Sequence, residues 1–158
     1  MLKRNTVRAA AMLLITFGAL GWRAPALAAE HGTAAEATAL VKKAVAHLQA
    51  SDAAKAYADF SDPAGAFRDR DLYIFVIDMD GLELANGANP KIIGKNVLDL
   101  KDADGNMMVK ALIALARGKG AGWVDYNWPN PVSHTVDKKS AYVEKYQNVL
   151  VASGIYKK

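Results

Sequence analysis

Residues 122–142, GWVDYNWPNPVSHTVDKKSAY, contain the pattern that decides the fold of this chain. Apolar and aromatic side chains alternate with polar ones over 122–128, which predicts a β-strand. Pro129 and Pro131 then end that strand, because proline donates no hydrogen bond to a sheet. Alternation resumes over 139–146. The stretch therefore predicts two antiparallel strands joined by a stiff loop of roughly ten residues.

Three further strands complete the predicted sheet. Residues 72–77 are apolar on both faces, so we expect this strand in the interior of the sheet. Asp-Met-Asp-Gly at 78–81 predicts a tight turn, after which 82–85 returns beside the first strand. The last strand is expected at 149–156, close to the end of the sequence.

Helical periodicity marks three other segments. Apolar residues recur every third or fourth position over 30–50, which predicts one long helix. Ser51-Asp52 is a typical start for a second, shorter helix. A third helix is expected over 107–117, capped by Asp104 or Asn106.

The segment between the strands and the third helix is irregular. Residues 86–101 contain two glycines and a proline, and loops of this length often bind ligands. The strands follow one another along the chain, and the helices are expected on one side of the sheet. This arrangement predicts a single α+β domain with antiparallel strands rather than a parallel sheet.

Residues 1–28 have the three-part pattern of a secretory signal: a basic start, an apolar run over 9–21, and Ala-Leu-Ala at 26–28. A membrane anchor is the alternative. A span needs about 20 apolar residues, however, and Arg23 and Pro25 interrupt this run. We therefore expect cleavage before Ala29.

The expected mature domain, residues 29–158, is then periplasmic or secreted. The whole chain carries a net charge of +4, and its isoelectric point is near 9.2. The excess comes from the four basic residues before position 29, whose loss leaves 16 basic against 16 acidic residues. Nucleic-acid binding depends on clustered positive charge, so this class of function is not predicted.

The sequence lacks the cysteine, histidine and acidic patterns that are typical of metal sites and catalytic sites. There is no cysteine, which excludes disulfides and attachment of c-type haem. The Asp-rich turns at 78–81 and 102–105 lack the later acidic ligands of a calcium loop. Ser133 and His134 are adjacent in sequence, which does not make a nucleophile–base pair. We predict no enzyme, no metal site and no cofactor.

Several segments, taken in order, resemble the single Cache domains of type 2, which are PAS-like extracytoplasmic sensor domains. The resemblance covers about residues 34–156. It rests on the sequences DLYIFVIDMDG (71–81), NPKIIGKNVLDLKDADG (89–105), GWVDYNWPNP (122–131), KKSAY (138–142) and ASGIY (152–156).

The resemblance implies a PAS-like five-stranded antiparallel sheet with a long N-terminal helix and a helix-containing loop on one side. It also implies a pocket on one sheet face for a small organic acid. Lys139 is the expected cationic partner of the acid. The other expected pocket residues are aromatic, namely Tyr73, Phe75, Tyr126, Trp128 and Tyr142.

Asn86 stands where the resemblance leads us to expect a histidine. An amide can hydrogen-bond a ligand but does not change charge near neutral pH, so it provides no pH-linked binding.

Three functions follow in order of preference. The first is a ligand-binding domain that presents its bound state to a partner, such as a membrane receptor or a kinase. The second is a protein-interaction module without a small ligand, and the third is an enzyme.

Overall fold

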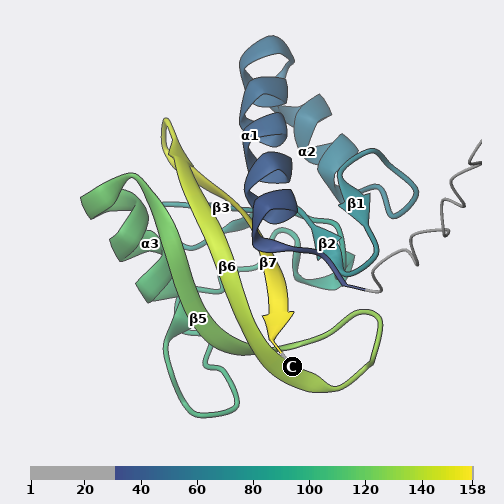
Figure 1. Ribbon diagram of the computed structural model, residues 1–158. Helices are drawn as coiled ribbons and strands as arrows, with labels where there is room; N and C mark the ends of the chain where they lie inside the picture. Colours follow the sequence, from purple (N-terminus) through teal and green to yellow (C-terminus); the bar gives the residue numbers. More distant parts are fainter. Residues whose placement is uncertain (1–30, 158) are drawn as a thin grey trace, which may run out of the picture.

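A five-stranded antiparallel sheet forms the centre of the computed structural model, which describes residues 31–157 (Figure 1). In spatial order its strands are β4 (Glu83–Asn86), β3 (Phe75–Asp78), β7 (Val149–Lys157), β6 (Val136–Tyr146) and β5 (Ala121–Pro129). Every neighbouring pair is antiparallel. The predicted α+β class is confirmed, and so is the interior position of the first predicted strand.

The predicted strand over 72–77 is interrupted at Ile74. Leu72–Tyr73 forms β2, which pairs with β1 (Arg68–Asp69) in a separate two-stranded sheet. The large sheet begins at Phe75, which pairs with Asn86 of β4 and with Ala152 of β7. The Ile74 carbonyl accepts a hydrogen bond from Gly87 N–H instead.

The hairpin of β5 and β6 is longer than predicted. Proline was expected to end the first strand, yet β5 runs through Pro129, which pairs with Val136. The loop between them is correspondingly shorter than the roughly ten residues expected. The physical reason is that β5 lies at the edge of the sheet, where a proline is tolerated.

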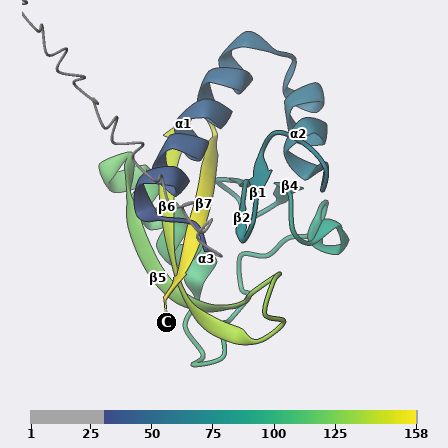
Figure 2. The same cartoon turned by 45° about the vertical axis from the view of Figure 1, so that its right-hand side comes forward.

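Helices cover both faces of the sheet (Figure 2). The sequence pattern predicts them on one side only. α1 (Ala34–Ala50) and α2 (Ala53–Ser61) lie on one face, which we call the α1 face. α3 (Met108–Lys119) lies on the other, the α3 face, together with the irregular segment that holds a short 3-10 turn, η1 (Pro90–Ile92).

The ends of the helices follow from local hydrogen bonds. Thr33 and Glu36 form a reciprocal capping box at the start of α1, and the Asp52 carboxylate caps α2 as predicted. The predicted cap of α3 is wrong, since Met107 occupies the cap position and makes no side-chain hydrogen bond there.

Alternation along the strands divides the apolar residues into two cores. Ile74 and Val76 face α1 and α2, whereas Phe75 and Ile77 face α3. A side chain on one strand therefore reaches one core only. This rule determines which of the predicted site residues meet.

Ser153 offers a test of the α1-face core. It lies on β7 with no exposed surface, and its hydroxyl finds no hydrogen-bond partner among the described residues. Because an unpaired buried hydroxyl is costly, Ser153→Ala is expected to raise the free energy of unfolding by about 1 kcal/mol. Urea denaturation of the two proteins measures this change.

The matched control is Ser140→Ala. Ser140 is also buried, but it faces Asp125 in the strand register, and after Lys157 its hydroxyl helps to lower the pKa of that carboxylate. This variant is expected to lose about 0.5–1.5 kcal/mol of unfolding free energy. Equal changes at both positions would contradict the assignment of Ser153 as an unpaired group.

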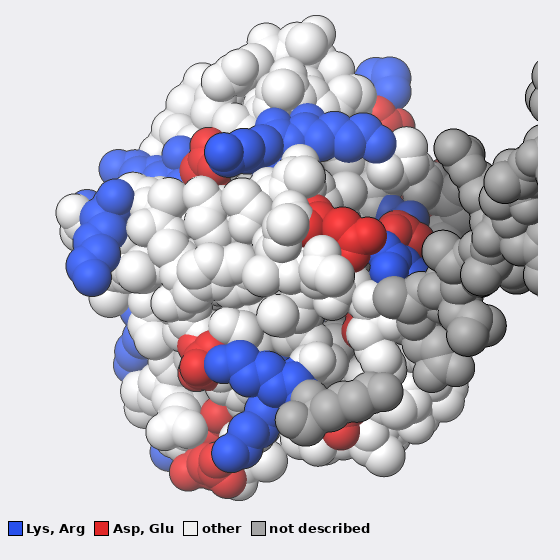
Figure 3. Space-filling view, viewed as in Figure 1, with Lys and Arg blue, Asp and Glu red and all other residues white. Residues whose placement is uncertain are grey.

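Charge on the described surface is mixed. Figure 3 shows Lys and Arg interspersed with Asp and Glu on the face that it presents, without a large region of one sign. Within residues 31–157, no helix combines the length and apolar character that crossing a membrane requires. The predicted signal segment and its cleavage before Ala29 lie outside the described residues.

Candidate ligand-binding site

A small cavity lies on the α3 face of the sheet. Side chains of β2, β3, β4 and β5 form one wall, and apolar residues of α3 and of the irregular segment close the other. The cavity leaves about 30 Å³ for the centres of water molecules, which is room for roughly two or three waters. Its polar or aromatic lining residues are Tyr73, Phe75, Glu83, Asn86, Tyr126 and Trp128.

Lys139 lies next to this cavity and is 1% exposed. The strand register places it on β6 directly between Tyr126 of β5 and Tyr156 of β7. Its Nζ donates one hydrogen bond, to Tyr73 Oη at 2.7 Å, and lies 4.0 Å from the centre of the Tyr73 ring. Lys139 does not line the cavity itself but contacts its wall through Tyr73.

The ammonium of Lys139 is incompletely paired. An ammonium has three N–H donors, and Tyr73 Oη is its one hydrogen-bond acceptor among the described residues. No ion pair of residues 31–157 includes Lys139 or Glu83. Aromatic rings of Phe75 and Tyr156 lie 5.5 Å and 5.0 Å away and supply partial compensation. Two donors of a buried cation are left for another acceptor.

Gly154 makes room for the lysine side chain on the sheet surface. A Cβ at this position would lie 2.6 Å from Lys139 Cε and 2.8 Å from the Ser140 carbonyl oxygen. Ala141 faces Gly154 in the register, and it also has a small side chain. The Lys139 stem can therefore lie flat across β7 toward Tyr73.

Two tyrosines order the hydroxyl protons beside the ammonium. Tyr156 Oη donates to the Pro129 carbonyl at 2.8 Å, and it lies 3.5 Å from Tyr73 Oη. Burial raises the pKa of Tyr156, so the phenol stays protonated. Because Tyr73 accepts from Lys139, its own proton can be donated to Tyr156 or to a bound ligand. Ammonium and hydroxyl donors thus converge at one point.

Glu83 adds a titratable group to the cavity wall. It is 3% exposed, and Asn86 Nδ2 donates to its Oε1 at 2.8 Å. Burial raises the pKa of Glu83 to about 7, although the hydrogen bond from Asn86 and the charge of Lys139 act in the opposite direction. The carboxyl group therefore changes its charge near neutral pH. This contrasts with the prediction from Asn86, whose amide provides no pH-linked binding.

A β-bulge explains why Glu83 was missed. Residues 83 and 86 are an odd number of positions apart, and regular alternation would place them on opposite faces. The register shifts between Val76 and Ile77, so that Ala85 pairs with the first and Glu83 with the second. Both Glu83 and Asn86 consequently line the cavity. No pattern in the sequence signals this shift.

Five of the seven predicted pocket residues line the cavity, and Lys139 lies beside them. The five are Tyr73, Phe75, Asn86, Tyr126 and Trp128. Asn86 is less available than expected, since its Oδ1 already accepts from the backbone N–H groups of Ala88 and Asn89. Tyr156 and Glu83 belong to the same cluster and were not predicted.

The prediction that Tyr142 shares this pocket is wrong. Tyr142 pairs with Trp123 across the hairpin and stacks against its ring at 5.4 Å. It packs on the α1 face, whereas Lys139 and Tyr126 face α3. Lys139 and Tyr142 are three positions apart on β6, so alternation places their side chains on opposite faces of the sheet.

The Asp-rich loop before α3 serves a structural role. Asp102 accepts hydrogen bonds from the backbone N–H groups of Asp104, Asn106 and Asn127. Burial raises the pKa of Asp102, but these bonds and the Asn106 side chain outweigh burial and lower it to about 2. Across residues 31–157, no group of three His, Asp or Glu is arranged to hold a metal ion.

The model of one protein family, described as Single Cache domain 2, matches residues 25–158. Two curated proteins are similar over part of the chain. They are the methyl-accepting chemotaxis protein McpP of Pseudomonas putida, 30% identical over 90 residues, and the sensor histidine kinase MctS of Rhizobium johnstonii, 34% identical over 90 residues. These matches cover 56% and 55% of this chain but 16% and 19% of the two relatives, so the chain spans under a fifth of their length.

Three similar solved structures come from chemotaxis or chemosensory proteins. One is described as "Structural basis for carboxylic acid recognition by a Cache chemosensory domain" (TM-score 0.69, 27% identity, 78% of this chain and 92% of that chain). A second is a "Periplasmic sensor domain of chemotaxis protein" (TM-score 0.66, 27% identity, 78% and 94%). A third is a methyl-accepting chemotaxis protein from Vibrio parahaemolyticus (TM-score 0.65, 26% identity, 77% and 86%).

Proposed function

Because the chain belongs to the Single Cache domain 2 family, we propose that it is an exported sensor-type domain that binds a small organic acid. The carboxylate binds at Lys139 and Tyr73, and the carbon chain of the acid lies between the cavity's aromatic and apolar walls. The bound state is then presented to a partner, such as a membrane receptor or a kinase.

One observation carries this proposal: the buried ammonium of Lys139 has two N–H donors that find no acceptor among residues 31–157. A buried charge that is not fully paired costs free energy. A carboxylate would accept from both donors and would also cancel the charge. The carboxylic acid-recognising Cache domain with the same fold supports this choice of ligand class.

The cavity favours a short acid. Its space of about 30 Å³ for the centres of water molecules admits only a few non-hydrogen atoms. Its walls include Ile92, Val97 and Leu112, which cannot hydrogen-bond a second polar group, while the polar Glu83 and Asn86 are hydrogen-bonded to each other. The expected ligand is therefore a monocarboxylate with a short apolar chain.

The relatives support a sensory role outside the cytoplasm. They include a chemotaxis protein and a sensor histidine kinase, and one structural neighbour is a periplasmic sensor domain. The signal-like pattern of residues 1–28 is consistent with export. Catalysis is not part of the proposal, because the side chains gathered at the cavity suit binding and include no nucleophile–base pair.

Calorimetric titration with acetate, propionate and butyrate tests the proposal. Each acid is compared with its primary amide, which has the same shape without the charge. Acids are expected to bind and amides to bind at least about 10-fold more weakly, since a charge-assisted pair is lost. A chain that binds neither series, or binds both equally, contradicts the proposal.

Two tyrosine variants locate the site on one face of the sheet. Tyr73→Phe removes a hydroxyl beside the ammonium and is expected to weaken acid binding by about 1 kcal/mol. Tyr142→Phe removes the same atom on the opposite face and is expected to leave affinity unchanged. The same titration measures both. A larger loss at Tyr142 than at Tyr73 would place the ligand on the α1 face.

A further inference from the structure

A second hollow adjoins the ligand cavity. It lies between the residues after β4, Ala88 and Asn89, and the loop from Pro129 to His134 that joins β5 to β6. On the same measure it holds about 290 Å³, against about 30 Å³ for the inner cavity. Exposed residues on its rim, among them Pro129 and His134, open it to solvent. We call it the outer groove.

Of the described residues, Tyr73 and Trp128 are the two that line both spaces. They therefore form the partition between the inner cavity and the outer groove. A ligand that enters from the outer groove must displace one of them. The length of ligand that the inner cavity accepts also depends on where this partition stands.

The two partition residues differ in how firmly they are held. Tyr73 Oη accepts from the Lys139 ammonium, and the Tyr73 side chain is almost fully buried. Trp128 is half-buried, and its indole N–H donates no hydrogen bond to the residues that the structure describes. Its ring contacts the Tyr126 ring edge-on, with 6.3 Å between the two ring centres. Trp128 is thus the less firmly held of the two partition residues.

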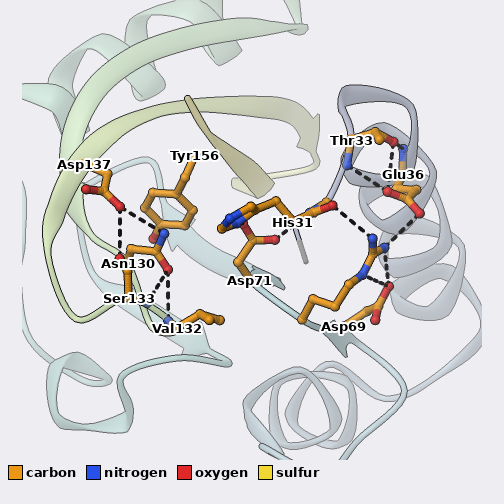
Figure 4. Close-up of polar contacts among 12 residues, drawn as sticks. His31, Thr33, Glu36, Asp69, Asp71, Asn130, Val132, Ser133, Asp137 and Tyr156 are labelled. Atoms are coloured by element: carbon orange, nitrogen blue, oxygen red, sulfur yellow. Dashed lines mark hydrogen bonds and ion pairs between the residues drawn. The ribbon is translucent and has the colours of Figure 1, made fainter. Parts of the chain in front are cut away.

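The backbone on either side of the partition is held by side-chain hydrogen bonds. On one side, Asn86 Oδ1 accepts from the N–H groups of Ala88 and Asn89. On the other, Asn130 Oδ1 accepts from Val132 and Ser133 while its Nδ2 donates to Asp137, as Figure 4 shows. Both flanking backbone segments are thus held by hydrogen bonds, so the side chain of Trp128 is the part of this boundary that a substitution alters most directly.

We propose that Trp128 is the residue that determines ligand length, because its indole separates the inner cavity from the outer groove. This inference rests on the proposed function. With Trp128 in place, the chain selects acids that end at the indole. With a smaller residue there, the inner cavity beside Lys139 and the outer groove become one channel that opens to solvent, and longer monocarboxylates fit.

Titration with straight-chain monocarboxylates from acetate to hexanoate tests the proposal in Trp128→Ala and in the milder Trp128→Phe. For the unaltered chain, affinity is expected to fall once the acid reaches the indole. For Trp128→Ala, the best ligand is expected to be longer, with a gain of about 10-fold for each methylene that finds new room. Trp128→Phe is expected to shift the optimum in the same direction by a smaller amount.

Trp123→Ala is the matched control. Trp123 lies on the same strand, packs on the opposite face beside Tyr142 and is 39% exposed. Its removal is expected to leave the order of affinities unchanged. Thermal unfolding of every variant is recorded beside the titrations, and Trp128→Phe decides the matter if Trp128→Ala is not folded.

The possible outcomes separate this inference from the proposed function. A longer preferred acid in the Trp128 variants, with the control unchanged, supports the partition. An unaltered length profile in folded Trp128 variants that still bind acids overturns it and leaves the proposed function in place. If the unaltered chain binds none of the acids, the proposed function itself fails.

Discussion

Replacing Lys139 by methionine is expected to weaken monocarboxylate binding about 30- to 150-fold, equivalent to about 2–3 kcal/mol. Lys139 is a buried cation at the candidate site, and two of its three donors lack an acceptor in the part of the chain that the structure describes. Methionine has nearly the same length but neither charge nor donors. Calorimetric titration with the best acid measures the loss.

The same variant is expected to keep its stability. A buried, partly paired ammonium is costly, so an apolar residue of similar volume is neutral or stabilising. Urea denaturation should therefore show an unfolding free energy equal to or above that of the unaltered chain. Loss of affinity without loss of stability identifies a residue kept for binding rather than for folding.

Lys138→Met is the matched control. Lys138 is the preceding residue of β6, it is exposed, and alternation turns it to the other face. Its removal is expected to change affinity by well under 1 kcal/mol. Small and equal effects at Lys138 and Lys139 would mean that the ligand's charge is matched elsewhere.

Glu83→Gln is expected to remove a pH dependence of stability worth about 3 kcal/mol. The pKa of Glu83 rises from 4.5 to about 7 in the folded chain, chiefly through burial. Between these values the folded state holds a proton that the unfolded state releases. The contribution of Glu83 to the free energy of unfolding therefore falls as the pH rises from about 4.5 to about 7.

Urea denaturation at pH 5 and pH 8 measures this effect. The unaltered chain is expected to lose about 2.5 kcal/mol more than Glu83→Gln between the two conditions, because part of the effect is already present at pH 5. Glutamine is a suitable replacement, because its carbonyl can still accept the hydrogen bond from Asn86 Nδ2. Parallel profiles for the two proteins would show that Glu83 is not titrating in this range.

Glu83 also predicts the direction of pH-linked binding. An acid bound as its anion in the same cavity repels ionised Glu83 and tolerates the protonated form. Affinity for acids is therefore expected to be higher at pH 6 than at pH 8 in the unaltered chain. This difference should be absent in Glu83→Gln.

The sequence by itself determined the class of fold and most of the aromatic side of the site. Period-two alternation over 122–128 and 139–146 places Tyr126 and Trp128 on one face of their strand and predicts the hairpin. The apolar run over 72–77 predicts an interior strand, as found for β3. These inferences succeed because a local pattern of side chains reports which face of an element is buried.

Only the tertiary structure decided which faces meet. Pairing of Tyr126 with Lys139 sets the register of the hairpin, and a shift by one residue would bring Tyr142 to the cavity face instead. The bulge between β3 and β4 likewise turns Glu83 toward the cavity. Register and bulges depend on pairing between distant segments, so no local pattern encodes them.

Charge at the site was also decided by tertiary structure. The sequence shows an ordinary lysine and an ordinary glutamate, and both would be exposed and paired with water on an average surface. Packing of α3 and the irregular segment over the sheet buries Lys139 and Glu83 together. Loss of water raises the pKa of the glutamate and leaves donors of the lysine without acceptors, because a charge is stabilised mainly by what surrounds it.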